Sequence, residues 1–212
     1  MQHHEVNTDT LSEHEQAQLQ QGIQLVRQRL QQQVQPPLSL QQPVLIRQLH
    51  RQLELLSEHA QCGGAFACKP GCASCCDKPK QVSLAELRYI VSQLALCQAH
   101  QLQHWRSKIA QTLAGKSPNC PFLNQQAACE IYALRPAVCR KAHSYSAPAC
   151  LSNQATIPQH LGLVMQAEAL ILGTQQALQA ETEADDASNS NPTLEFVAGL
   201  HQLLNETLST SI

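Results

Sequence analysis

Hydrophobic residues recur at every third or fourth position in several stretches of the chain, which is the period of an amphipathic helix. Residues 10–35 form the first stretch. It starts at the capping-box pattern Thr10-Leu-Ser-Glu13 and stops at Pro36-Pro37. A second helix is predicted from about Pro43 through Leu56, because proline suits the first turn of a helix.

The same pattern predicts three more helical regions. Ser83-Leu-Ala-Glu86 is a capping pattern for a helix that continues, with a break, to Gly115, and glycine commonly ends helices. Another helix is expected from Pro158 to about Ala180, and Asn191-Pro192 is expected to cap the last one. No segment shows the alternation of a strand, so we expect a mainly α fold.

The segments between these helices suggest the domain organisation. Residues 61–82 and 116–157 combine prolines and cysteines without a helical period and are predicted to be loops. Residues 182–191 are acidic and polar, as is typical of a linker. We expect helical arms packed around a loop-rich, cysteine-rich domain. The expected parts are an N-terminal arm over 1–60, the cysteine domain over 61–155 and C-terminal helices over 156–212.

Composition supports a helical core and gives an expected location. Aromatic residues make up only 3% of the chain, so the core must be built from Leu, Ala, Ile and Val, which favours packed helices. We expect no secretory signal peptide, because the N-terminus has no basic start and no apolar stretch. We expect no membrane association, because no run of about 18 apolar residues is present. The expected location is the cytoplasm, where thiols stay reduced and clustered cysteines are typical of metal-binding or catalytic sites.

The net charge of −2 conceals an uneven distribution. Residues 62–150 hold ten basic and three acidic residues, a charge of +7, whereas the flanks hold four basic and thirteen acidic residues. Positive charge favours thiolates, so the excess suits a cluster of ionised cysteines. A nucleic-acid partner is not indicated, because no recognition-helix pattern accompanies the basic residues.

Four of the ten cysteines lie within nine residues, in Cys68-Lys-Pro-Gly-Cys72-Ala-Ser-Cys75-Cys76. Pro70-Gly71 favours a tight turn, since proline presets one turn dihedral and glycine permits a positive φ at the next position. Such a turn lets the sulfurs on either side converge on one ion. The adjacent Cys75 and Cys76 point about 100° apart on a helix or to opposite faces of a strand, so we expect them not to share one mononuclear ion.

The remaining clustered cysteines are nine to eleven residues apart and must reach the first group through the fold; they are Cys120, Cys129, Cys139 and Cys150. Four thiolates on Zn²⁺ or on a [4Fe–4S]²⁺ core leave a charge of about −2, which Arg135, Arg140 and Lys141 are expected to offset. Both cofactors stay open. A structural zinc would stabilise a loop-rich segment, but only Cys72 and Cys75 have zinc-knuckle spacing. The number of cysteines exceeds what one zinc needs and favours an iron–sulfur cluster.

These motifs together resemble the YkgJ-type cysteine-cluster proteins, also called the CxxCxxCC, or zinc- or iron-chelating, domain. The resemblance covers about residues 62–151. It rests on the CxxxCxxCC run, a helix with Glu86, Cys120-Pro-Phe-Leu, Cys129-x-Ile131-Tyr132-x-x-Arg135-Pro136-x-x-Cys139-Arg140, and Cys150. It implies metal chelation by eight cysteines, namely Cys68, Cys72, Cys75, Cys76, Cys120, Cys129, Cys139 and Cys150.

Two functional hypotheses follow. The first is a non-catalytic protein that binds a metal ion or cluster, with a protein partner left open. The second is an iron–sulfur enzyme, an oxidoreductase or a protein-modifying enzyme, because a related cysteine cluster occurs in bacterial flagellin lysine methylases. This chain departs from those methylases in having only helical arms outside the cluster domain. No catalytic residue is assigned.

Six further residues were considered. Arg135, Arg140 and His143 are candidate cofactor-binding residues beside the cysteines. Tyr132 is expected in the core rather than in catalysis. Cys97, between Leu94 and the following polar residues, is interpreted as a small packing residue within a helix, and Cys62 falls outside the motif set.

Overall fold

The computed structural model describes residues 11–33, 41–61, 66–69, 71–76, 78–117, 120–152, 157–179 and 192–209. The prediction of a mainly helical fold is confirmed, since the strands in these residues form a single two-stranded sheet. The chain divides into two compact units. Unit 1 comprises Met1–Ala67 and Cys139–Asn191, and unit 2 comprises Cys68–Val138 and Pro192–Ile212. The cysteine-rich residues 61–155 thus contribute to both units.

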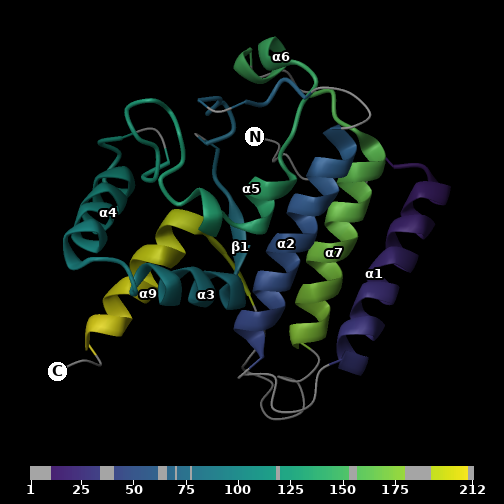
Figure 1. Ribbon diagram of the computed structural model, residues 1–212, viewed down its shortest axis with the longest axis horizontal. Coiled ribbons are helices and arrows are strands. Elements are labelled where there is room, and N and C mark those ends of the chain that lie inside the picture. The colour runs from purple at the N-terminus through teal and green to yellow at the C-terminus, as the bar shows by residue number, and fades with distance from the viewer. Residues whose placement is uncertain are drawn as a thin grey trace. The chain divides into compact units, whose positions relative to one another are not determined.

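Unit 1 is built on three long helices, α1 (Glu13–Gln33), α2 (Gln42–Gln61) and α7 (Leu161–Gln179). Helix α7 lies between the other two and packs against both (Figure 1). Two short helices precede it in the chain: α5 (Ala137–Lys141), which crosses the unit boundary, and α6 (Ala147–Leu151).

Glycines let α1 and α7 approach closely. A Cβ atom on Gly173 of α7 would lie 2.7 Å from the Cβ of Val26 and 2.9 Å from the carbonyl oxygen of Ile23. A Cβ atom on Gly22 of α1 would lie 3.0 Å from the Cβ of Ala169. The two helix backbones therefore meet at distances that larger side chains would prevent.

Helix α1 begins later than the sequence pattern indicates. Thr10 lies outside the described residues, and the capping box that the structure has is formed by Ser12 and Glu15. The Ser12 backbone N–H donates to the Glu15 carboxylate at 2.8 Å, and the Glu15 N–H donates to the Ser12 hydroxyl at 3.3 Å. The linker predicted over 182–191 also lies outside the described residues.

Unit 2 contains α3 (Leu84–Leu94), α4 (Ala99–Leu113), the 3₁₀ helix η3 (Tyr132–Leu134) and α9 (Phe196–Ser209). Helix α9 packs against both α3 and α4 (Figure 1). The core between them is aliphatic and aromatic, and its fully buried members include Leu87, Ile90, Ile109, Phe122 and Leu200.

The start and the break of the predicted 83–115 region are confirmed. The Ser83 hydroxyl accepts the N–H of Glu86 at 3.4 Å and caps α3. Residues 95–97 form a turn between α3 and α4. Gly115 has a φ of +69°, the left-handed conformation that glycine adopts readily after a helix.

Two short strands were not expected from the sequence. β1 (Gln81–Ser83) pairs antiparallel with β2 (Thr193–Glu195), with Val82 opposite Leu194. The sequence pattern did not reveal them, because three residues are too few to show alternation and the partner strand lies near the other end of the chain.

The pairing also shifts the start of the last helix. Residues 193–195 are extended, so α9 begins at Phe196 rather than directly after Asn191-Pro192. The Glu195 carboxylate accepts the N–H of Ala198 at 2.9 Å and satisfies one donor of its first turn. None of the helices within the described residues is long and apolar enough to span a membrane.

Candidate metal centre

Residues 120–130 of unit 2 form a hairpin-like loop that carries two predicted ligands, Cys120 and Cys129. We call it the Cys120–Cys129 loop. Leu123 and Cys129 form an antiparallel bridge, and the N–H of Glu130 donates to the Phe122 carbonyl at 2.7 Å. Cys129 thus lies opposite Leu123, and Leu123 is only three residues after Cys120. The fold therefore brings two cysteines from different parts of the motif to one loop.

The tip of this loop is closed by Asn124. Its backbone N–H donates to the Ala128 carbonyl at 2.9 Å, and its side-chain oxygen accepts the N–H groups of Gln126 and Ala128, both at 2.9 Å. Ala127 has a φ of +56°, a left-handed conformation uncommon for alanine. The loop's own hydrogen bonds therefore define its shape.

Phe122, within the Cys120-Pro-Phe-Leu motif, anchors the loop to the core of unit 2. Its side chain is 0% exposed. The ring lies edge-on to Trp105 of α4, with ring centres 6.1 Å apart, and 5.9 Å from the ring of Phe196 of α9. The motif therefore places Cys120 at the edge of the core because Phe122 is inside it.

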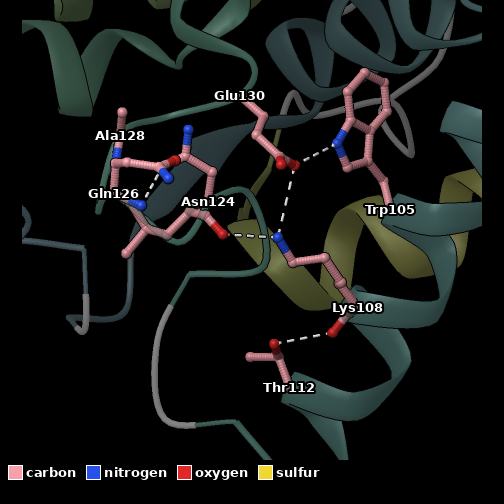
Figure 2. A network of polar contacts seen from close by, with 8 residues as sticks. Trp105, Lys108, Thr112, Asn124, Gln126, Ala128 and Glu130 are labelled. Carbon is pink, nitrogen blue, oxygen red and sulfur yellow. Dashed lines mark hydrogen bonds and ion pairs between the residues drawn. The ribbon is translucent and has the colours of Figure 1, made fainter. Parts of the chain in front are cut away.

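Two side chains of α4 hold the same loop through polar contacts (Figure 2). The Lys108 ammonium donates to the Leu123 carbonyl at 2.7 Å and lies 3.6 Å from the Glu130 carboxylate. The Trp105 indole N–H donates to the same carboxylate at 2.9 Å. The sequence interpretation missed these residues, although a tryptophan and a lysine three residues apart on a helix share one face, and Glu130 directly follows a candidate ligand.

The first group of cysteines lies directly against this loop. We call residues 68–76 the Cys68–Cys76 loop. The N–H of Cys120 donates to the Cys76 carbonyl at 3.1 Å. A Cβ atom on Gly71, which has a φ of +85°, would lie 3.4 Å from the Gln126 carbonyl oxygen. The positive φ agrees with the tight turn predicted for Pro70-Gly71, although Pro70 is outside the described residues.

Burial and lysine charges act in opposite directions on the pKa of the Cys120 thiol. Burial raises the pKa of Cys120, and the neighbouring Cys129 acts in the same direction, whereas a hydrogen bond from the Phe122 backbone and the charges of Lys80 and Lys108 act against the increase. Lys80 is held in place because its ammonium donates to the Cys75 carbonyl at 2.6 Å. Some of the positive charge counted in the sequence therefore acts on a candidate ligand.

Six of the eight predicted ligands lie on the two loops of unit 2. Cys68 is exposed, and the other five are partly buried: Cys72, Cys75, Cys76, Cys120 and Cys129. Cys139 and Cys150 are also partly buried and belong to unit 1. Across the described parts of the chain, no three His, Cys, Asp or Glu side chains stand close enough together to hold a metal ion.

The two cysteines outside the motif differ from this set. Cys97 lies in the turn after α3, where it packs against the core and its thiol donates to the Gln93 carbonyl at 3.8 Å. This position fits its interpretation as a packing residue, although it follows a helix rather than lying within one. Cys62 lies outside the described residues.

Glu86 connects α3 to the Arg135-Pro136-x-x-Cys139 motif. Its carboxylate is buried and accepts the N–H of Ala137 at 2.7 Å, at the first residue of α5. A carboxylate at this end of a helix satisfies a backbone donor and interacts favourably with the helix dipole. This contact fixes the chain two residues before Cys139.

Tyr132 and Arg135 form a contact at the protein surface. The guanidinium carbon of Arg135 lies 4.0 Å from the centre of the Tyr132 ring, which is a cation–π geometry. Tyr132 is 57% exposed, so the expectation that it lies in the core is wrong; its neighbour Ile131 fills the core instead.

Arg140 and Lys141 are engaged with acidic residues of unit 1. Arg140, which is buried, forms an ion pair with Glu54 of α2, and Lys141 forms one with Glu168 of α7. Each of these buried cations therefore has a carboxylate partner, as burial requires, and a role for them in offsetting thiolate charge stays a prediction. The charges of Lys80 and Lys108 lower the pKa of Cys120 against the effect of burial.

His143 is buried and both of its ring nitrogens have partners. Nδ1 lies 2.8 Å from the Lys141 carbonyl, which can only accept, and Nε2 accepts the N–H of His160 at 3.0 Å. These contacts require the neutral ring with the proton on Nδ1. Burial lowers the pKa of His143, which agrees with that state. Cofactor binding by His143 stays a prediction, and it would require one of these two hydrogen bonds to break.

The fold and site define a mainly helical, cysteine-rich domain in which two thiol-bearing loops abut. Residues 67–160 match the model of the CxxCxxCC family, described as a putative zinc- or iron-chelating domain. The match confirms the resemblance drawn from the cysteine motifs and includes all eight candidate ligands. No curated protein and no solved structure matches the chain.

The residues on the two loops fit such a metal in their chemistry. Thiolates are good ligands for zinc and for iron–sulfur clusters, whereas Mg²⁺ and Ca²⁺ prefer oxygen donors. The hydrogen bond between Cys120 and Cys76 joins the two loops through their backbones, at residues that carry the sulfurs.

Proposed function

We propose that this protein binds a metal centre, an iron–sulfur cluster or zinc, through the cysteine thiolates of its CxxCxxCC segment. The observation that carries the proposal is the contact between the Cys68–Cys76 and Cys120–Cys129 loops, marked by the 3.1 Å hydrogen bond from the Cys120 N–H to the Cys76 carbonyl. The contact brings onto adjacent loops six thiols, of which the outermost two, Cys68 and Cys129, are 61 residues apart along the chain.

The charge around these loops supports thiolate ligands. Binding releases the thiol proton, and the Lys80 and Lys108 ammonium groups favour the thiolate of Cys120 against the effect of burial. A bound metal would supply the remaining positive charge. On this proposal the thiolates of the two loops would hold the metal centre.

The number of thiols supports an iron–sulfur cluster over a single zinc. One tetrahedral zinc needs four ligands, and the two loops of unit 2 carry six thiols. Cys75 and Cys76 are adjacent, so their side chains leave the backbone in different directions. Cys139 and Cys150 are proposed as ligands from the sequence motif alone, and variants at each position test them separately.

A second function, catalysis at the cluster, would require a substrate pocket beside the cysteines. A pocket of about 290 Å³ lies between α4 and α9, where Arg106, His201 and Asn205 are among its lining residues. None of the residues lining it is a cysteine. Metal binding itself, which needs only the thiols of the two loops, is the function that we propose.

The test is anaerobic purification of the full chain, followed by metal and sulfide analysis and an absorption spectrum. Stoichiometric iron and sulfide with a broad band near the edge of the visible range would support a cluster, and stoichiometric zinc without colour would support the zinc form. A chain that retains neither metal, and takes up neither after reconstitution, would refute the proposal.

Serine variants assign the ligands. Cys72→Ser and Cys120→Ser should lose most of the bound metal, because serine is a poor ligand for these ions at neutral pH. Cys97→Ser is the matched control, since Cys97 is a cysteine of the same unit outside the motif and should leave the metal content unchanged. Equal metal content in Cys72→Ser, Cys120→Ser and Cys97→Ser would show that the ligand assignment is wrong.

A further inference from the structure

Lys108 of α4 contacts both sides of the Cys120–Cys129 loop. Its ammonium donates to the Leu123 carbonyl at 2.7 Å and lies 3.6 Å from the Glu130 carboxylate. Leu123 is the bridge partner of Cys129, and Glu130 follows Cys129 directly. Figure 2 shows the Lys108 side chain extending from the helix towards the loop, with a dashed line from its ammonium to the Glu130 carboxylate.

The acceptor on one side of this contact is itself held in place. The Trp105 indole N–H donates to the Glu130 carboxylate at 2.9 Å, to the same oxygen that faces Lys108. Trp105 is 6% exposed and is fixed by its packing against Phe122. The position of the Glu130 carboxylate is therefore set by Trp105, and Lys108 contacts the carboxylate at that fixed position.

The contact is too exposed to act mainly through stability. The side chains of Lys108 and Glu130 are 25% and 28% exposed, and water screens ion pairs of this kind. Its geometric effect is more direct. One ammonium group on α4 contacts both sides of the loop. The first side runs from Cys120 to Leu123, and the second side carries Cys129 and Glu130.

We infer that Lys108 is a positioning residue of the metal centre, which sets the separation and direction of Cys120 and Cys129 through the Leu123 carbonyl and the Glu130 carboxylate. This inference rests on the proposed metal-binding function. Groups that orient metal ligands without touching the metal commonly change its affinity by about 10- to 100-fold when they are removed. Without Lys108 the loop keeps its own hydrogen bonds and its Phe122 anchor, but loses its polar connection to α4 at Leu123.

The test uses Lys108→Met, Lys108→Arg and Lys116→Met in the full-length apoprotein. Methionine keeps the length of the side chain and removes the donor, whereas arginine keeps a cationic donor. Lys116 is an exposed lysine of the same unit, beyond the end of α4, so Lys116→Met makes the same change of charge away from the loop. Each protein is titrated with Co²⁺ under anaerobic conditions, with affinity measured against a competing chelator and thiolate coordination from the thiolate-to-cobalt charge-transfer band.

Lys108→Met should weaken Co²⁺ binding by about tenfold or more and reduce the charge-transfer intensity at saturation. Lys108→Arg should recover most of both, and Lys116→Met should match the wild type. The thermal midpoints of the apoproteins should differ little, which separates positioning from loss of fold. Wild-type affinity and band intensity in Lys108→Met would overturn the inference while leaving the proposed function intact.

Two further measurements separate failure of the inference from misfolding of the variant and from failure of the proposed function. If Lys108→Met does not fold, Glu130→Gln carries the test, because it removes the charge that faces Lys108 and keeps an acceptor for Trp105. It should give an intermediate loss of affinity, and wild-type binding in this variant would overturn the inference. A wild-type protein that is purified without metal, binds no Co²⁺ and takes up neither iron nor zinc after reconstitution would instead refute the proposed function.

Discussion

Replacing Phe122 by alanine removes the ring through which the Cys120-Pro-Phe-Leu segment is anchored. The side chain is 0% exposed and its ring lies within 6.1 Å of Trp105 and 5.9 Å of Phe196, centre to centre. Truncation therefore loses the whole transfer free energy of the ring and leaves a cavity between two helices, at a cost of about 3–5 kcal/mol. That is a large part of the stability of a typical domain, which is about 5–15 kcal/mol.

Trp105 makes the effect measurable in unit 2 alone. It is the only tryptophan of the chain, so its fluorescence reports the core in which Phe122 lies. Urea titrations should be made with a chelator present, because a bound metal would add to the stability of the folded state. For a denaturant dependence of about 1.5 kcal/mol per molar urea, the unfolding midpoint should fall by about 2 M or more.

Two control variants define the result that would refute this reasoning. Phe122→Leu keeps part of the buried volume and should lose less than Phe122→Ala. Leu96→Ala truncates a side chain that is 80% exposed and should change the unfolding free energy by no more than about 0.5 kcal/mol. A Phe122→Ala loss as small as that of Leu96→Ala would mean that the ring does not anchor the loop.

Two predictions concern unit 1. Gly173→Ala places a Cβ atom 2.7 Å from Val26, so it should destabilise the α1–α7 contact by about 1–3 kcal/mol; an unchanged thermal midpoint in circular dichroism would contradict this. Because burial lowers the pKa of His143, its contribution to stability is complete above the unfolded pKa of about 6.5 and is lost as the pH falls from there towards the folded pKa. The thermal midpoint should therefore fall more steeply between about pH 7 and pH 5 in the wild type than in His143→Gln, and equal slopes would exclude this role.

The helices and the cysteine motif were predictable because their signals are local. A 3.6-residue period, the Ser83–Glu86 cap and the glycine at 115 each depend on residues within one or two turns of a helix. The capping box of α1 shows the limit of such signals. Two overlapping pairs fit the pattern, and only the position of the first turn selects Ser12 and Glu15.

Contacts between distant residues could not be predicted in this way. The sequence showed a basic central segment, but it did not show that Arg140 and Lys141 pair with Glu54 and Glu168. It also gave His143 a claim to cofactor binding, whereas the fold occupies both ring nitrogens with backbone groups. The ion pairs and the histidine hydrogen bonds depend on which helices and loops pack beside these residues. A short sequence motif does not show which distant segments will pack there.

The sequence by itself determined the class of this protein: helical segments, an ordered set of cysteines and an excess of positive charge around them. These features follow from side-chain chemistry and spacing along the chain. The tertiary structure alone decided that Cys120 lies against Cys76, that Phe122 is the anchor and that Lys108 faces Leu123 and Glu130. The physical reason is that a loop takes its position from the core and helices it packs against, which lie far away in the sequence.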